Sequence, residues 1–414
     1  MMNNFLFLFL YFFIPILFFY LIIPEICLHI LGWGSWKRQY TSGVALTFDD
    51  GPDPNFTPLI LDSLAKLGVK ATFFLVAEKA ENHPALVRRI VQEGHTIGCH
   101  CYAHRHAWTM GPMTTIRYWK KGLASIKQLS GHEPEYIRPP WGGVNLAFYL
   151  WCKLRGKQIV HWSIQGHDWL HTQTPEKILH EILPKIKAGS IILLHDSGGD
   201  FGAPQNTVEL LPKLVSEIYQ NLKLPLVELE IPNWSLYRRI FFRLWEQWER
   251  FYVWYFHIQR IDPCNLFRLS LARYKGPNLY DHKGNLLAAK GDLIGEIHLD
   301  SLQLQFHEQD YRKIGVKTLQ LARKSFPVLT KFIFNSPDYK DIKVYLGVTM
   351  LSKAVKGFGF HVQDYHSIFS RMTALFQKII IKIYHPGGGR ETSSLGDKPK
   401  LVWITRDTLA EKYL

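Results

Sequence analysis

Residues 41–232 alternate between short β-rich runs and amphipathic stretches, and this alternation limits the possible folds more than any other feature. Val44–Phe48 is typical of a buried strand, whereas Thr57–Leu67 has its apolar residues at helical spacing and ends at Gly68. The pattern predicts further strands at Ala71–Val76, Thr96–Gly98, Ile159–Ser163 and Ser190–Leu194, and helices at Pro84–Glu93, Pro175–Lys187 and Val208–Gln220. Such alternation indicates an α/β fold with a parallel sheet, either closed as a barrel or open.

The N-terminus carries an apolar run, Phe5–Ile23, without a charged side chain. As a helix rising 1.5 Å per residue, it is long enough to reach across a hydrocarbon layer of about 30 Å. A basic n-region and a small-residue cleavage site, which signal peptides have, are not evident, so residues 1–33 are predicted to be an uncleaved, single-pass anchor. Lys37 and Arg38 follow this run with no Lys or Arg before it, which favours the cytoplasmic face for the next domain.

The composition, 47% hydrophobic and 20% charged, excludes a disordered chain. Most of the net charge of +14 lies in residues 235–414, which hold 28 Lys+Arg against 16 Asp+Glu, whereas residues 1–234 hold 21 against 19. This excess fits either an anionic partner, such as lipid head groups, or a solvated surface. Five cysteines in 414 residues do not make a disulfide framework.

Four polar clusters follow the C-terminal ends of predicted strands, where α/β folds place their chemistry. Asp49 and Asp50 are adjacent carboxylates, and His100 and His104 are close enough along the chain for one turn to bring both imidazoles to a metal. Each pattern alone has an ordinary explanation, a turn in the first case and chance in the second. Their joint occurrence at strand ends favours a site.

The other two clusters add a cation and a titratable base. Arg138 lies in a stiff segment that continues through two prolines to Trp141 and Gly142. His195 ends a strongly apolar strand, a position where packing does not call for a histidine.

Together these residues resemble the polysaccharide deacetylase family, that is, the NodB-homology domain of carbohydrate esterase family 4. The resemblance covers residues 34–234 and rests on five motifs in order: Thr47-Phe48-Asp49-Asp50-Gly51-Pro52, His100-x-x-x-His104, Arg138-x-Pro140-Trp141-Gly142, Asp168-Trp169 and Leu193-x-His195. It implies a distorted (β/α) barrel. It also implies a hydrolase that uses a divalent metal to remove acetyl groups from N-acetylated sugars.

The resemblance also implies residue roles. The metal ligands would be Asp50, His100 and His104. Asp49 would be the general base that activates a water, held by Arg138, and His195 the general acid for the leaving amine, oriented by Asp168. The backbone N–H of Trp141 would bind the developing oxyanion. The acetyl and sugar groups would lie in a pocket lined by Pro140, Trp141, Trp169 and Leu193.

Elementary chemistry agrees with these roles, because amide hydrolysis needs an activated water, a stabilised anion and a protonated leaving group. Zinc suits the predicted ligands, and cobalt or manganese also fits. Two alternatives are an O-acetyl carbohydrate esterase and an inactive carbohydrate-binding scaffold, although an intact Asp49 and His195 argue against the scaffold. Cys99 and Cys101 depart from the family pattern; we expect them to pack as small apolar residues or to make the site sensitive to oxidation.

Residues 235–414 form a different region, which resembles the uncharacterised YkoP-like domain of Bacillus-type bacteria. Residues 235–257 combine aromatic residues with arginines, so this predicted helix lies either at a membrane interface or between domains. We also predict a strand at Leu293–Gln305, helices near 309–333 and 349–361, a flexible loop at Pro386–Arg390 and a last strand at Leu401–Thr405. The region shows no catalytic cluster.

The predicted partners are therefore an acetylated glycan and the membrane, with no nucleic acid. Two features conflict over location. A polymeric glycan lies outside the membrane, whereas the charge pattern favours the inside. We give substrate access the greater weight and predict an extracellular catalytic domain.

Overall fold

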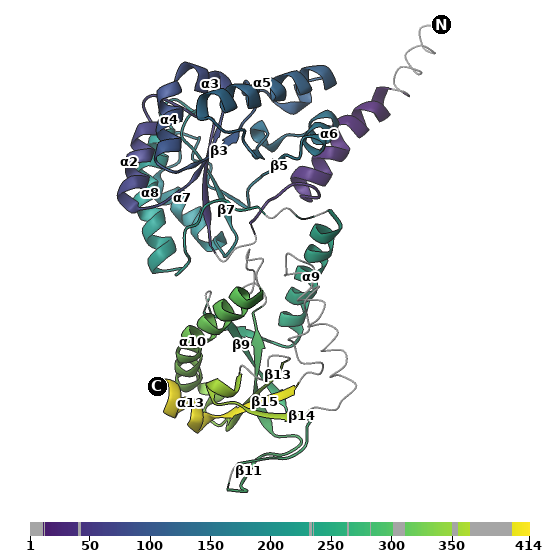
Figure 1. The fold of residues 1–414 in the computed structure, drawn as a ribbon, viewed down its shortest axis with the longest axis vertical. Helices are drawn as coiled ribbons and strands as arrows, with labels where there is room; N and C mark the ends of the chain where they lie inside the picture. Colours follow the sequence, from purple (N-terminus) through teal and green to yellow (C-terminus); the bar gives the residue numbers. More distant parts are fainter. Residues whose placement is uncertain are drawn as a thin grey trace. The chain divides into compact units, whose positions relative to one another are not determined.

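The computed structural model describes residues 11, 13–39, 43–231, 234, 236–262, 265–281, 283–300, 311–349, 355–364 and 400–414. The chain divides into two compact units, Met1–Arg239 and Ile240–Leu414 (Figure 1). Each unit has its own sheet. The finer division into residues 1–33, 34–234 and 235–414 stays a prediction.

A seven-stranded parallel sheet forms the centre of the first unit, in the order β5-β4-β3-β2-β1-β7-β6. Its strands are β1 (Ala45–Asp49), β2 (Thr72–Leu75), β3 (Thr96–Cys99), β4 (Tyr136–Ile137), β5 (Gln158–Ile159), β6 (Ile164–Gln165) and β7 (Ile191–His195). No pairing among the described strands joins the β5 and β6 edges. The sheet is thus a curled half-barrel, and the predicted α/β class with a distorted barrel is confirmed.

Helices connect these strands: α2 (Thr57–Leu67), α3 (Ala77–Asn82), α4 (Pro84–Gln92), α5 (Pro112–Ser130), α6 (Leu146–Leu154), α7 (Pro175–Ile182) and α8 (Pro204–Gln220). In Figure 1 they surround the strands of this unit. α2 ends at the predicted residue because Gly68 adopts a left-handed conformation (φ 67°) that caps it. α5 was not predicted from the sequence, and two of its buried residues, Thr115 and Gly122, are not apolar.

The predicted strand Ile159–Ser163 is wrong. β5 ends at Ile159 and β6 begins at Ile164. Between them, the carbonyl oxygens of Val160 and His161 accept hydrogen bonds from the Arg138 guanidinium, at 3.2 and 3.0 Å. These two backbone acceptors are bonded to a functional side chain.

The N-terminal helix includes two π-helical stretches, η1 (Phe18–Ile22) and η2 (Glu25–Ile30). Phe13–Ile30 has a mean hydropathy of 2.1 and is the one helix among the described residues that is long and apolar enough to cross a membrane, a property that signal sequences share. Its C-terminal half contacts the first unit beside α6 (Figure 1, purple), and the Tyr20 hydroxyl donates to the Met110 carbonyl at 3.1 Å.

The second unit contains a six-stranded mixed sheet in the order β14-β15-β13-β12-β9-β8 and a hairpin, β10-β11. Its elements are α9 (Leu236–Tyr255), β8 (Gln259–Arg260), β9 (Phe267–Arg273), β10 (Leu279–Tyr280), β11 (Leu286–Ala288), β12 (Leu293–Leu299), α10 (Tyr311–Asn335), β13 (Val344–Thr349), β14 (His361–Asp364), β15 (Lys400–Thr405) and α13 (Arg406–Tyr413). α10 packs against α13. Phe326 of α10 stacks on Tyr413 of α13 within the main apolar core.

The structure confirms the helices at 235–257 and 309–333 and the last strand. The strand predicted at Leu293–Gln305 is β12, with residues 301–305 outside the described part. Of the helix predicted near 349–361, residues 350–354 lie outside the described part. Val355 is helical, a 3-10 turn follows at Lys356–Phe358, and Gly359 (φ 91°) ends it before β14 begins at His361. Phe358 and Phe360, near the end of this segment, both pack on Phe326. The predicted loop Pro386–Arg390 lies outside the described residues.

Candidate active site

The sheet brings the predicted polar clusters together, because parallel strands end at the same edge. Asp49 ends β1 and pairs with His195, the last residue of β7. On the other side of β1, His100 directly follows β3, and its backbone N–H donates to the Leu75 carbonyl of β2. Arg138 directly follows β4. Clusters that are distant in the sequence thus meet at one edge.

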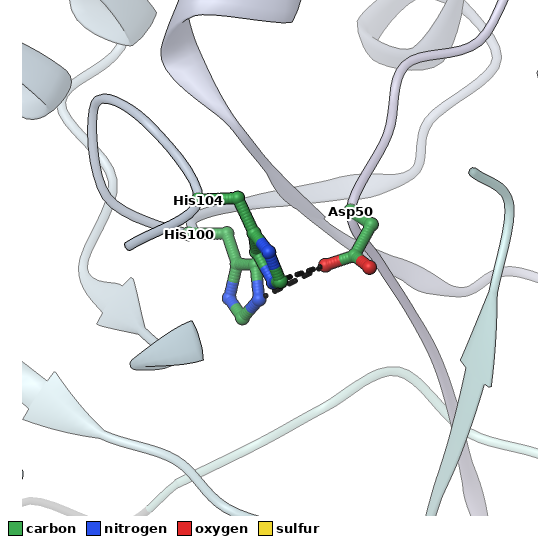
Figure 2. Close-up of side chains that lie close together, drawn as sticks. All are labelled: Asp50, His100 and His104. Atoms are coloured by element: carbon green, nitrogen blue, oxygen red, sulfur yellow. Dashed lines mark ion pairs between the residues drawn. The ribbon is translucent and has the colours of Figure 1, made fainter. Parts of the chain in front are cut away.

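Asp50, His100 and His104 form a group that could hold a metal ion, with ligand atoms all within 4.8 Å of one another (Figure 2). Asp50 Oδ1 lies 3.3 Å from His100 Nε2 and 2.9 Å from His104 Nε2. His100 Nδ1 donates to the Arg138 carbonyl at 2.7 Å, which fixes the ring so that Nε2 points to Asp50. Burial raises the pKa of Asp50, but bonds and charges from both histidines hold it well below its usual range. A carboxylate with two imidazoles fits a divalent transition metal.

Asp49 lies beside this group and is held by Arg138. The guanidinium is fully buried and donates to Asp49 Oδ1 at 2.7 Å. The other oxygen, Oδ2, lies 3.9 Å from His100 Nε2, so it faces the metal group. Burial lowers the pKa of Arg138, and the charge of Asp49 opposes that shift. The pair thus keeps one carboxylate oxygen aimed at the site.

His195 is held by Asp168, which lies in the loop after β6. Asp168 Oδ1 accepts from His195 Nδ1 at 2.9 Å, and Oδ2 accepts the backbone N–H of His195 at 2.7 Å. With Nδ1 bonded, Nε2 is the nitrogen left for substrate. Burial lowers the pKa of His195, but the charge and hydrogen bond of Asp168, with the charges of Asp50 and Asp49, raise it to about 9. His195 is therefore suited to carry a proton at neutral pH.

The four predicted pocket residues differ in exposure. Trp141 is 55% exposed, and its ring lies 4.0 Å from that of His104, centroid to centroid. The Trp169 ring meets the His195 ring edge-on at 5.1 Å. Leu193 is buried and lies two residues before His195 on β7, hence on the same face of the sheet. Pro140 is buried and begins the turn that presents Trp141.

Three residues that complete the site were assigned no role from the sequence. The Thr47 hydroxyl accepts from Arg138 at 2.8 Å, and the Thr207 hydroxyl donates to Asp168 at 2.6 Å. Asp196 is fully buried, and burial, resisted by Thr57 and Lys79, raises its pKa to about 7. Thr47 could have been found from its strand alternation with Asp49. Thr207 lies on α8, 39 residues after Asp168, and nothing in the sequence links the two.

Cys99 and Cys101 are both buried, and burial raises the pKa of each thiol, that of Cys101 to about 12. Neutral thiols pack as small apolar groups. This geometry favours the packing interpretation.

Comparisons with known proteins identify the protein family. Residues 37–154 match the family described as Polysaccharide deacetylase, and residues 238–413 match the YkoP domain. A peptidoglycan-N-acetylglucosamine deacetylase of Bacillus cereus is 39% identical over 193 residues, which cover 44% of this chain and 69% of that protein. The chain belongs to the polysaccharide deacetylase family.

Two further relatives extend this comparison. A chitooligosaccharide deacetylase of Sinorhizobium fredii is 33% identical, covering 42% of this chain and 85% of that protein. A crystal structure of a peptidoglycan N-acetylglucosamine deacetylase, in complex with a naphthyl-substituted N-hydroxybenzamide, is 35% identical with a TM-score of 0.45, covering 49% of this chain and 93% of that chain. The Polysaccharide deacetylase match lies within the first unit.

Proposed function

We propose that this protein is a metal-dependent N-deacetylase of a polysaccharide, and that Asp49 and His195 are its general base and general acid. The observation that carries the proposal is their arrangement. The two residues are register partners on β1 and β7, each is held by a separate buried partner, and both flank the group Asp50, His100 and His104.

The base step belongs to Asp49. Arg138 fixes one oxygen of this carboxylate, so the other is free to take a proton from the attacking water. The water oxygen then bonds to the acetyl carbonyl carbon. The negative charge passes to the carbonyl oxygen, where the backbone N–H of Trp141 is the proposed donor.

The acid step belongs to His195. Its protonated Nε2 donates to the sugar nitrogen as the C–N bond breaks, so the products are acetate and a free amine. Asp168 supports this step in two ways: it fixes the tautomer and favours the protonated ring. An amine is a poor leaving group without that proton.

Asp50, His100 and His104 would hold the metal, and zinc is the proposed ion. A divalent ion there supplies Lewis-acid polarisation of the carbonyl and lowers the pKa of water. Cobalt and manganese accept the same ligands.

The proposed substrate is an N-acetylglucosamine-type sugar of a cell-wall polysaccharide such as peptidoglycan. Relatives that carry this activity in their names support it. The half-exposed ring of Trp141 supports it as well, because flat indole faces pack against sugar C–H surfaces.

We also propose that the N-terminal helix anchors the protein in a membrane with the deacetylase unit outside. The helix α9 is a second proposed membrane contact. It leaves Trp248, Phe251 and Trp254 exposed while Phe242 is buried, and aromatic rings are favoured at the depth of lipid head groups.

Acetate release from the full chain in detergent tests the function. N-acetylated and O-acetylated glycans are compared, with and without a chelator. The proposal expects release from N-acetylated glycans that a chelator abolishes and added zinc restores. Release from O-acetylated glycans alone would identify an esterase, and binding without release on every substrate would identify a scaffold.

A further inference from the structure

The N-terminal helix contacts the loop that carries Trp141 through a glutamate. Glu25 Oε2 accepts the backbone N–H of Val144 at 3.0 Å, and Glu25 Oε1 lies 2.6 Å from His29 Nδ1. Both side chains are largely shielded from solvent, with exposed fractions of 18% and 28%. One carboxylate therefore joins the helix to the loop and orients an imidazole one helical turn further on.

His29 makes the second contact. Its ring stacks on that of His161, with centroids 4.9 Å apart and planes 10° from parallel. His161 is fully buried, and its Nε2 bonds to the Gly142 carbonyl at 3.0 Å. A Cβ atom at Gly142 would lie 2.7 Å from His29 Nε2, so the histidine sits directly against the loop at a position that only glycine allows.

The loop needs such support because of Trp141. This residue has φ 55° and ψ 12°, a left-handed conformation that an indole side chain rarely adopts and that persists only where the surroundings impose it. The conformation directs the Trp141 ring against His104 and sets the direction of its backbone N–H, the proposed oxyanion donor. The Asn145 side chain, next along the chain after Val144, donates to the Ala107 carbonyl at 2.8 Å. The N-terminal helix and Asn145 thus both hold the end of this loop.

We propose that Glu25 and His29 are positioning residues of the catalytic site, so that the N-terminal helix helps to fix the geometry of the loop that carries Trp141. The inference rests on the proposed deacetylase function. Glu25 is also the first charged residue after the apolar run Phe5–Ile23, with only Pro24 between them. The segment predicted to lie in the membrane is therefore joined to the catalytic loop without a flexible linker.

The test uses the full chain in detergent, with N-acetylglucosamine oligomers as substrate. Glu25→Ala removes the acceptor of the Val144 N–H, whereas Glu25→Gln keeps a carbonyl oxygen there. His29→Phe keeps a flat ring against His161 and loses the bond to Glu25. Ile26→Ala is the matched control, because Ile26 neighbours Glu25 on the same helix and is 38% exposed.

Glu25→Ala is expected to lower kcat about ten- to a hundredfold, with KM and zinc affinity unchanged, because a displaced donor weakens the transition state and leaves the metal ligands in place. Glu25→Gln and His29→Phe should retain most of the activity. Hydrogen exchange at residues 141–144 should accelerate about tenfold in Glu25→Ala and stay unchanged in Ile26→Ala.

Two results would overturn the inference. One is a Glu25→Ala protein whose kcat and loop exchange match those of Ile26→Ala. The other is an equal loss of activity, zinc affinity and thermal stability in Glu25→Ala and Glu25→Gln, which would indicate a general folding role. If the unsubstituted chain releases no acetate, the deacetylase proposal fails. The exchange comparison still decides whether Glu25 holds the loop.

Discussion

Arg138 donates to two side chains and two backbone carbonyls, and only one of these bonds goes to the carboxylate it activates. The contacts to Val160 and His161 fix the guanidinium even without Asp49. A change at Asp49 should therefore leave its surroundings in place. The structure allows the role of this carboxylate to be tested without disturbing the metal group.

Asp49→Asn is expected to retain bound metal and to lower turnover about 10²- to 10⁴-fold, because an amide cannot accept the proton from water. The measurement is acetate release together with metal content. Asp62→Asn is the control, since Asp62 is a half-exposed carboxylate on α2, paired with Arg89. Unchanged turnover in Asp49→Asn would exclude Asp49 as the base.

Asp168→Asn is expected to move the alkaline limb of the kcat/KM profile to lower pH. The pKa of His195 is raised to about 9 largely by Asp168, and the acid must be protonated, so activity falls as pH rises through that pKa. Removing the carboxylate charge lowers this pKa and makes the loss begin earlier. The profile is measured across neutral and alkaline pH.

Asp200→Asn is the control for that experiment. Asp200 also accepts from a histidine, His171, at 2.7 Å, but both of these side chains are exposed to solvent. Its profile should match that of the unsubstituted chain. If the alkaline limb of Asp168→Asn stays at the same pH, a group other than His195 determines that limb.

At the scale of elements, the turn Pro140–Gly142 meets the N-terminal helix at Gly142. Gly142→Ala should destabilise the fold by about 1–3 kcal/mol more than Gly68→Ala, because both glycines have positive φ and only Gly142 lies against another side chain. Thermal unfolding of the two variants measures the difference.

The contact partner can be tested by removing it. In a His29→Ala background, Gly142→Ala should lose part of that extra cost, since the contact at 2.7 Å with His29 is gone while Trp162 Cη2 still lies 3.0 Å from the Cβ position. If Gly142→Ala lowers the stability equally with and without His29→Ala, the contact between His29 and Gly142 does not contribute to the loss.

The helices and strands also show which features of the fold could be predicted from the sequence. β1 and α2 were predictable because an apolar run and a glycine stop are local signals. The spacing of His100 and His104 indicated a metal pair, whereas Asp50 was added as a ligand only by the resemblance to the family. α5 was missed, and two of its buried residues, Thr115 and Gly122, are not apolar. The helix predicted near 349–361 extended too far, because Phe358 lies in a 3-10 turn and β14 begins at His361. Contacts such as Thr207 with Asp168 depend on tertiary folding alone.

For the whole molecule, the charge is concentrated in the region that lacks the site. Residues 235–414 hold 28 Lys+Arg against 16 Asp+Glu. Inside this unit some of that charge is paired, since Arg268 and Arg260 both donate to the buried carboxylate of Asp300. The remaining excess fits either a solvated surface or an anionic lipid surface, and the second alternative favours the cytoplasmic leaflet.

Location is the last prediction, and two physical tendencies oppose each other there. Lys37 and Arg38 after the apolar run favour the cytoplasmic face, whereas a wall polysaccharide is reached only from outside. Two charges are a weak determinant, so we expect the deacetylase unit on the exterior. Protease added to intact cells should then digest it, while a cytoplasmic marker protein survives. If the unit is digested only after lysis, the exterior placement is wrong, and the substrate must be a sugar available on the cytoplasmic side.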